Sequence, residues 1–257
     1  MPAPSQAPPP LRSYRATTPA LPAVAAALQL ALPGDTLQRL QDYVHLLLRW
    51  NRTYNLVGAR DEATIVAEHV ADCLAIVPVL QRRLDPARTR LVDMGSGGGL
   101  PAVIIAMSMP ALHVVAVEPV AKKAAFLRQA AAVCHIPNIS VAETRMAELL
   151  PHLSSIEATQ APARERHFSS RAFADMRTLI AEATPFATRG SRLFAMKSAR
   201  LQHELATVDA SRVQVHDLTV PTLDAPRYLA EVRLEAPPDR MPSADTPRPT
   251  SATERSA

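Results

Sequence analysis

A glycine-rich loop constrains this sequence more than any other feature. Four of the seven glycines fall within five positions of the segment Asp93-Met94-Gly95-Ser96-Gly97-Gly98-Gly99-Leu100-Pro101. An apolar run precedes this segment, and Pro101 can open a helix after it, because proline suits the first helical turn. Glycine is needed where the backbone takes a positive φ or approaches a ligand closely, and the N–H groups of a following helix point at that ligand. The segment therefore predicts a strand, a ligand-binding loop and a helix.

Short apolar runs alternate with helical patterns from residue 90 onward. The strand-like runs are 91–94, 114–117, 139–142, 168–173 and 193–196. Such alternation is typical of βαβ units and a parallel sheet. Two further runs, 213–220 and 228–234, have a short proline-containing connection and no helix between them. They predict an antiparallel hairpin at one edge of the sheet.

The sequence divides into four regions. Residues 28–88 carry two helical patterns, which Asp35 and Asp61 are expected to cap, the second ending near Pro78, and which together predict an N-terminal helical cap. Residues 89–235 hold the α/β pattern. Twelve of the 24 prolines lie in residues 1–22 and 236–257. Because such segments bury little apolar surface, we expect residues 1–27 and 236–257 to be disordered tails.

Composition excludes several classes of protein. A hydrophobic content of 47 % excludes global disorder, and no uninterrupted apolar run reaches the roughly 18–20 residues of a membrane span. The N-terminus lacks the layout of a secretory signal, and Cys73 and Cys134 form no metal-ligand pattern. We therefore expect a cytoplasmic monomer without metal or membrane. The net charge of +4 favours a polyanionic partner.

The loop differs from the fingerprint of dinucleotide-binding proteins. That fingerprint, G-x-G-x-x-G, needs a third glycine where this chain has Leu100. The pattern D-x-G-x-G-x-G resembles instead the first motif of S-adenosylmethionine methyltransferases. Glu118 follows the run 114–117, and a carboxylate there can accept hydrogen bonds from both hydroxyls of a ribose. We expect Asp93 to orient the loop and to lie near the cationic part of the cofactor.

Several other segments resemble one bacterial family, the glucose-inhibited division protein B family of 16S ribosomal RNA guanine-N7 methyltransferases. The resemblance covers about residues 35–235 and rests, besides the loop, on Trp50-Asn51-Arg52-Thr53-Tyr54-Asn55-Leu56-Val57, His69-Val70-Ala71-Asp72-Cys73-Leu74, Lys122-Lys123-Ala124-Ala125-Phe126-Leu127, Ser170-Arg171-Ala172-Phe173-Ala174 and Ala195-Met196-Lys197. The chain departs from the family's pattern at Cys73, Ala102, Pro119, Ala121, Glu165-Arg166 and Ser198. These departures mostly spare the polar cofactor ligands, and they bear on efficiency and local loop shape more than on reaction class.

The resemblance implies a fold, a cofactor and a reaction. The fold would be the Rossmann-like class I methyltransferase fold, with a mostly parallel seven-stranded sheet, an antiparallel edge hairpin and the helical cap. The cofactor would be S-adenosylmethionine, bound by Asp93, Gly95, Gly97, Gly99, Leu100, Glu118, Met146, Ala147 and Arg171. The reaction would methylate N7 of a guanine in the 16S rRNA of the small ribosomal subunit, after the base has left its stack.

Basic residues near the expected ligand-binding edge are candidates for the RNA contact. They are Lys122, Lys123, Arg145, Lys197 and Arg200, and Arg171 and Lys197 are also candidates for the catalytic centre. We interpret His69 as a structural residue at the helix–sheet junction and Trp50 as packing of the cap. Asn51, Asn55 and Arg60 could help to form the substrate cleft.

Three alternatives remain open at the level of the sequence. An NAD(P)-dependent oxidoreductase is disfavoured by Leu100 and by the absence of a Tyr-x-x-x-Lys pair. A methyltransferase acting on another RNA, a protein or a small molecule shares the same cofactor loop. A non-catalytic RNA-binding protein is the third alternative, because the changes at Ala102, Ala121 and Ser198 could have impaired activity.

Overall fold

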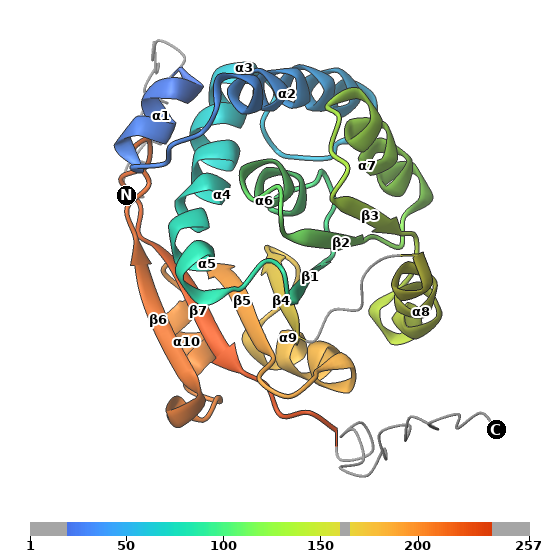
Figure 1. Ribbon diagram of the computed structural model, residues 1–257. Coiled ribbons are helices and arrows are strands. Elements are labelled where there is room, and N and C mark those ends of the chain that lie inside the picture. Colours follow the sequence, from blue (N-terminus) through green and yellow to red (C-terminus); the bar gives the residue numbers. More distant parts are fainter. Residues whose placement is uncertain (1–19, 160–164, 238–257) are drawn as a thin grey trace, which may run out of the picture.

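The computed structural model describes residues 20–159 and 165–237, and its centre is a seven-stranded sheet of order β3-β2-β1-β4-β5-β7-β6 (Figure 1). The strands are β1 (Thr89–Met94), β2 (His113–Val117), β3 (Ile139–Ala142), β4 (Glu165–Arg171), β5 (Arg192–Lys197), β6 (Val213–Leu218) and β7 (Arg227–Arg233). β1 to β5 are parallel, and β7 lies antiparallel between β5 and β6. This is the expected Rossmann-like fold with its antiparallel edge hairpin.

Helices cover both faces of the sheet (Figure 1). One face carries α1 (Leu21–Ala27), α2 (Gly34–Tyr54), α3 (Glu62–Thr64), α4 (Ala71–Ala75), α5 (Val77–Arg83), α6 (Ala102–Ser108) and α7 (Ala121–Val133). The other carries α8 (Leu149–Thr159), α9 (Met176–Ala183) and α10 (Leu201–Leu205). The other helical segments are the π-helix η1 (Ile65–Val70) and the 3-10 helices η2 (Met146–Glu148), η3 (Thr184–Phe186) and η4 (Ala210–Arg212).

The buried side chains form two clusters, one on each face of the sheet. Leu91 and Val114 belong to the first cluster, whereas Val92 and Val115 belong to the second, because neighbouring residues of a strand point to opposite faces. The first cluster also contains Leu47 of α2, and α2 contacts α6 and α7. The N-terminal helices thus share one core with the sheet.

Two expectations about the N-terminal region were wrong in detail. The boundary at residue 27 is wrong because α1 buries Leu21, Val24 and Ala25 in the first cluster; residues 1–19 and 238–257 of the expected tails lie outside the described residues. Asp35 lies in the first turn of α2, which begins at Gly34, and does not cap it. The second helix ends near Pro78 as expected: α4 ends at Ala75, and Pro78 stands in the first turn of the next helix, α5, where a proline removes no hydrogen bond. Asp61 caps α3 as expected, its Oδ1 accepting from Thr64 N at 2.8 Å.

The helical run Glu62–Arg83 is, by length and composition, the one candidate for a membrane span among the described residues. It passes through α3, the π-helical turn η1, α4 and α5. Buried residues make up 67 % of its most apolar window. A run so covered by its own protein is typical of a core helix, and it is weak evidence for a membrane segment.

Removing apolar volume from α1 should destabilise the whole protein. Val24 is 2 % exposed, so Val24→Ala should lower the free energy of unfolding by about 2 kcal/mol, the cost of removing two buried methyl groups. Ala26→Ser, at an exposed position of the same helix, is the matched control and should change it by less than about 0.5 kcal/mol. Denaturant unfolding measures both, and equal effects would show that α1 is not part of the cooperative core.

Candidate active site

The glycine loop lies at the point where the direction of strand order changes. β2 and β3 extend the sheet from one side of β1, whereas β4 and β5 extend it from the other. In open α/β sheets ligands bind outside the carboxyl ends of the strands at such a point. The loop after β1 and the segment after β4 both lie there, since β1 and β4 are parallel neighbours.

The loop needs glycine for its backbone conformation. Gly95, Gly97 and Gly99 have φ values of +71°, +53° and +85°, which side chains of L residues rarely allow. The backbone N–H groups of Gly95 and Ser96 both donate to Val117 O, at 3.0 Å. Tyr43 of α2 donates its hydroxyl hydrogen to Gly98 O. The loop is therefore fixed from β2 and from the helical cap.

Glu118 holds the loop from the end of β2. Its Oε2 accepts from Gly97 N and its Oε1 from Val120 N, both at 2.9 Å. The side chain is 3 % exposed. Each carboxylate oxygen has a second lone pair, so these bonds leave Glu118 able to accept from a ligand hydroxyl. Support of the loop by Glu118 is a role that the sequence pattern does not predict.

Asp93, the last but one residue of β1, is 1 % exposed and accepts a hydrogen bond from Ser169 Oγ at 2.8 Å. Burial raises the pKa of its carboxyl to about 7, because an ionised form is poorly solvated there. Its backbone oxygen accepts from Ser96 Oγ, at 3.1 Å. Asp93 is thus joined to the loop through Ser96.

The raised pKa of Asp93 predicts a pH dependence of stability. The stabilisation associated with the protonated carboxyl is complete below the ordinary pKa of 3.8 and is lost as the pH rises through about 7. Asp93→Asn cannot titrate, so its stability relative to the wild type should increase between pH 5 and pH 8. Chemical denaturation of the ligand-free proteins at several pH values measures this difference. A difference that stays constant with pH would contradict the assignment.

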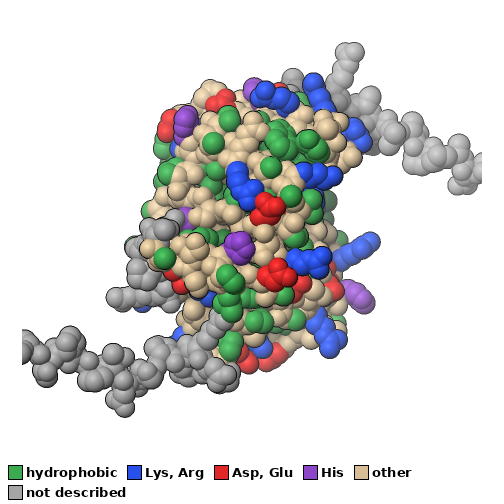
Figure 2. Space-filling model, turned by 90° about the vertical axis from the view of Figure 1, so that its right-hand side faces the viewer, with side chains coloured by type: hydrophobic (Ala, Val, Ile, Leu, Met, Phe, Trp, Pro, Cys, Tyr) green, Lys and Arg blue, Asp and Glu red, His purple; other side chains and the backbone are tan. Residues whose placement is uncertain are grey.

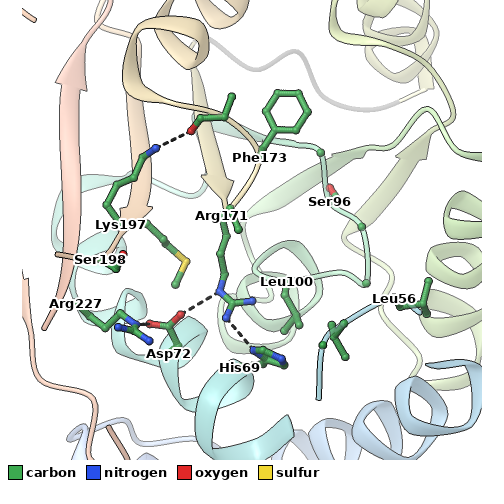
Figure 3. Close-up of a pocket in the computed structure, with 18 of the residues that line it drawn as sticks. Leu56, His69, Asp72, Ser96, Leu100, Arg171, Phe173, Lys197, Ser198 and Arg227 are labelled. Carbon is green, nitrogen blue, oxygen red and sulfur yellow. Dashed lines mark hydrogen bonds and ion pairs between the residues drawn. The ribbon is translucent and has the colours of Figure 1, made fainter. Parts of the chain in front are cut away.

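A cavity of about 790 Å³ opens beside the loop (Figure 3). Three segments line most of it: Leu56, Val57 and Gly58 after α2, Gly95 to Gly98 with Leu100, and Arg171 to Asp175 after β4. Five basic and three acidic side chains contribute to the lining. This size is typical of small-ligand sites, and the excess of positive charge favours an anionic ligand.

Arg171 joins the end of β4 to the helical cap (Figure 3). Its Nε donates to Asp72 Oδ2 at 3.0 Å, and its Nη2 contacts Glu68 O at 3.2 Å and His69 Nδ1 at 2.9 Å. Arg227 of β7 approaches the other oxygen of Asp72 at 3.5 Å. The Asp72 side chain is only 6 % exposed. The guanidinium is therefore held in one orientation at the floor of the cavity.

His69 acts as an acceptor in this network. Burial and the neighbouring Arg171 guanidinium lower the pKa of His69 to about 4. The ring is therefore neutral at neutral pH, and since Nδ1 accepts from Arg171, Nε2 carries the proton. This agrees with the structural role that we expected for His69.

Lys197, a candidate for RNA contact, has two partners within the protein. Its Nζ donates to Ala174 O at 2.6 Å and to Glu204 Oε2 at 2.7 Å. The side chain is 10 % exposed. Glu204 Oε2 also accepts from Met176 N at 3.0 Å. This ammonium therefore holds the segment after β4.

The candidate cofactor and RNA residues divide into two groups by their place relative to the cavity. Gly95, Gly97, Leu100, Lys123, Arg171, Lys197 and Arg200 line the cavity, whereas Asp93, Gly99, Glu118, Lys122, Arg145, Met146 and Ala147 lie outside the lining. Trp50 packs on Phe126 at a ring distance of 5.6 Å, as expected. Asn51 is buried and bonds to Val57 N and Ala59 O, so it supports the cleft from behind.

Four residues at the site were not singled out from the sequence: Tyr43, Phe173, Glu204 and Arg227. Tyr43 follows the apolar spacing of α2, so its bond to Gly98 has no sequence signal. Phe173 was included in a strand, but β4 ends at Arg171, because Ala172 takes a φ of +53° and leaves the extended conformation. Glu204 and Arg227 reach the site only through tertiary packing.

The face drawn in Figure 2 shows no continuous patch of basic side chains among the described residues. The face in Figure 2, which carries α7 and α8, shows Lys and Arg side chains scattered among acidic and apolar ones. This face alone does not identify an RNA-binding surface. The cavity and its rim therefore carry the functional argument.

Comparison with known proteins identifies the relatives of this chain. The family model described as rRNA small subunit methyltransferase G matches residues 36–229. A protein of Burkholderia pseudomallei named ribosomal RNA small subunit methyltransferase G is 38 % identical over 229 residues, covering 88 % of this chain and 95 % of the relative. The protein of the same name from Burkholderia multivorans is 38 % identical over 213 residues, covering 82 % and 90 %.

A solved structure agrees on the fold. A methyltransferase from Geobacter sulfurreducens superposes with a TM-score of 0.50 at 14 % identity, covering 82 % of this chain and 96 % of that one. At that identity the likeness concerns the fold alone. The match of the family model over most of the chain, with the glycine loop, the segment 69–74 and the segment 170–174 meeting at one cavity, shows that this chain belongs to the rRNA small subunit methyltransferase G family.

Proposed function

We propose that this protein transfers the methyl group of S-adenosylmethionine to N7 of a guanine in the 16S rRNA of the small ribosomal subunit. The observation that carries the proposal is the intact glycine loop beside a cationic cavity, in a chain of this methyltransferase family. The names of the relatives support an rRNA substrate. Such a substrate places the reaction in the cytoplasm.

The residues present fit S-adenosylmethionine. A Cβ at Gly97 would meet only a backbone oxygen, at 3.8 Å, so the loop leaves open space on the side of the cavity. Gly95, Gly97, Gly99 and Leu100 would hold the cofactor from the loop, with Glu118 on the ribose and Met146 and Ala147 on the adenine. Asp93 and Arg171 would supply the charged surroundings.

Methylation at N7 demands positioning more than acid–base catalysis. S-adenosylmethionine supplies a methyl group whose bond to the sulfonium breaks, with the electron pair remaining on sulfur, as a bond to the acceptor forms. Guanine N7 has a lone pair in the plane of the ring and loses no proton. Two carboxylates of the cavity, Asp72 and Glu204, are bound in ion pairs. They are therefore suited to orienting Arg171 and Lys197, and the reaction can proceed by orientation and exclusion of water.

Calorimetry separates this proposal from the oxidoreductase alternative. The purified protein should bind S-adenosylmethionine and should not bind NAD, because Leu100 replaces the third glycine of the dinucleotide fingerprint, which allows the helix to pack closely on the strand. A titration with each ligand under the same conditions measures this. Tight binding of NAD without binding of S-adenosylmethionine would contradict the proposed function.

A further inference from the structure

Phe173 differs from the other four phenylalanines of the chain. Phe126, Phe168, Phe186 and Phe194 are at most 4 % exposed, whereas Phe173 is 42 % exposed. It lines the cavity (Figure 3). An exposed aromatic ring in a cavity keeps apolar surface in contact with water, which is unfavourable unless a ligand covers it.

The ring lies directly beside the first glycine of the loop. A Cβ at Gly95 would be 2.9 Å from Phe173 Cγ and closer still to Cδ2. The position of the ring therefore requires glycine at residue 95. The positive φ of Gly95 is a second, separate reason for glycine there. Phe173 stands two residues after the end of β4, and its ring lies against the cofactor loop at Gly95.

The backbone around Phe173 is fixed on both sides. Before it, Arg171 is held by Asp72 and His69. After it, Ala174 O accepts from Lys197, and Asp175 caps α9 by accepting from Thr178 N at 2.9 Å. The ring is thus presented at a defined place, and its orientation depends mainly on its own side-chain torsions.

These observations point to an aromatic ligand, and we propose that Phe173 is the surface on which the acceptor guanine stacks. This inference rests on the proposed function. A base taken out of its stack loses the contacts of its two faces, and aromatic side chains commonly replace them. Stacking also fixes the plane of the base and thereby the direction of the N7 lone pair. Phe173 is then a positioning residue for methyl transfer, next to the loop that holds the cofactor.

Three substitutions test the stacking. Phe173→Leu keeps apolar volume but removes the aromatic face, and it should lower kcat/KM for small subunits that lack the modification by roughly tenfold or more. Phe173→Tyr should retain activity within about threefold, since it keeps the ring. The dissociation constant for S-adenosylmethionine, measured by calorimetry, should change less than about twofold in both variants. Unchanged kcat/KM in Phe173→Leu, or a loss explained by weaker cofactor binding, would overturn the proposal.

A spectroscopic readout is independent of turnover. In a Trp50→Phe background, Phe173→Trp places a single tryptophan at the proposed stacking site, and guanosine monophosphate should quench its fluorescence. The wild type, whose sole tryptophan is Trp50 on α2, is the control and should not be quenched beyond absorption by the nucleotide. Equal quenching in both proteins would overturn the proposal. A wild-type protein that transfers no methyl group would contradict the proposed function instead, and the quenching would still show whether a purine stacks at position 173.

Discussion

Replacing Glu118 by alanine is expected to weaken the binding of S-adenosylmethionine by about 2–4 kcal/mol, roughly 30- to 1,000-fold. The variant loses the expected acceptor for the ribose. It also removes the acceptor of Gly97 N and Val120 N, so that the loop loses its support from β2. Both effects reduce affinity in the same direction. Calorimetric titration of the variant and the wild type measures the change.

Glu143→Ala provides the control for this experiment. Glu143 is an exposed acid just after β3 that pairs with Arg128 at 2.7 Å, and it makes no contact with the loop that the structure shows among the described residues. Its substitution should alter cofactor affinity by less than twofold. If Glu118→Ala binds S-adenosylmethionine as tightly as the wild type, the ribose has been placed wrongly.

Replacing Arg171 by alanine should lower the free energy of unfolding by about 3–5 kcal/mol, because it leaves buried Asp72 without its nearest cation. His69 Nδ1 and Glu68 O lose a donor at the same time. The cap is then no longer joined to β4 at the floor of the cavity, so methyl transfer should fall as well. Unfolding by guanidinium chloride measures the loss of stability.

A double substitution separates the ion pair from other effects of Arg171. Asp72→Asn in the Arg171→Ala background removes the buried carboxylate that has lost its nearer cation, and it should restore part of the lost stability. Arg227→Ala, which removes the more distant partner at 3.5 Å, should cost less than Arg171→Ala. A loss below about 1 kcal/mol for Arg171→Ala would show that the network contributes little to the fold.

The order of elements could be predicted from local patterns, but the order of strands could not. Apolar runs identified every strand of the sheet to within a few residues, and the missing helix after 213–220 indicated the hairpin. That β7 enters between β5 and β6 depends on tertiary pairing, which leaves no local signal. The sequence patterns did not predict helix α1, because its few buried side chains stand next to a proline-rich stretch.

The candidate site shows the same division. The glycine loop and Glu118 were predictable, since positive φ and a strand-end carboxylate have local signatures. The network of Arg171, Asp72 and His69 joins segments about 100 residues apart, and no spacing rule reveals it. Lys197 stands at a strand end as a free ligand-binding lysine would, yet Glu204 pairs with it from α10. Sequence position therefore indicated which residues reach the site, and only packing showed which of them retain a free charge.

Mapping of methylated guanosines in 16S rRNA tests the central claim most directly. Ribosomal RNA from cells with and without this gene would be digested and compared by mass spectrometry. We predict one position that carries 7-methylguanosine in the presence of the gene and unmodified guanosine in its absence. The wild-type gene should restore the modification, and a gene encoding Glu118→Ala should restore much less. Identical maps of methylated guanosine from the two strains would contradict the account.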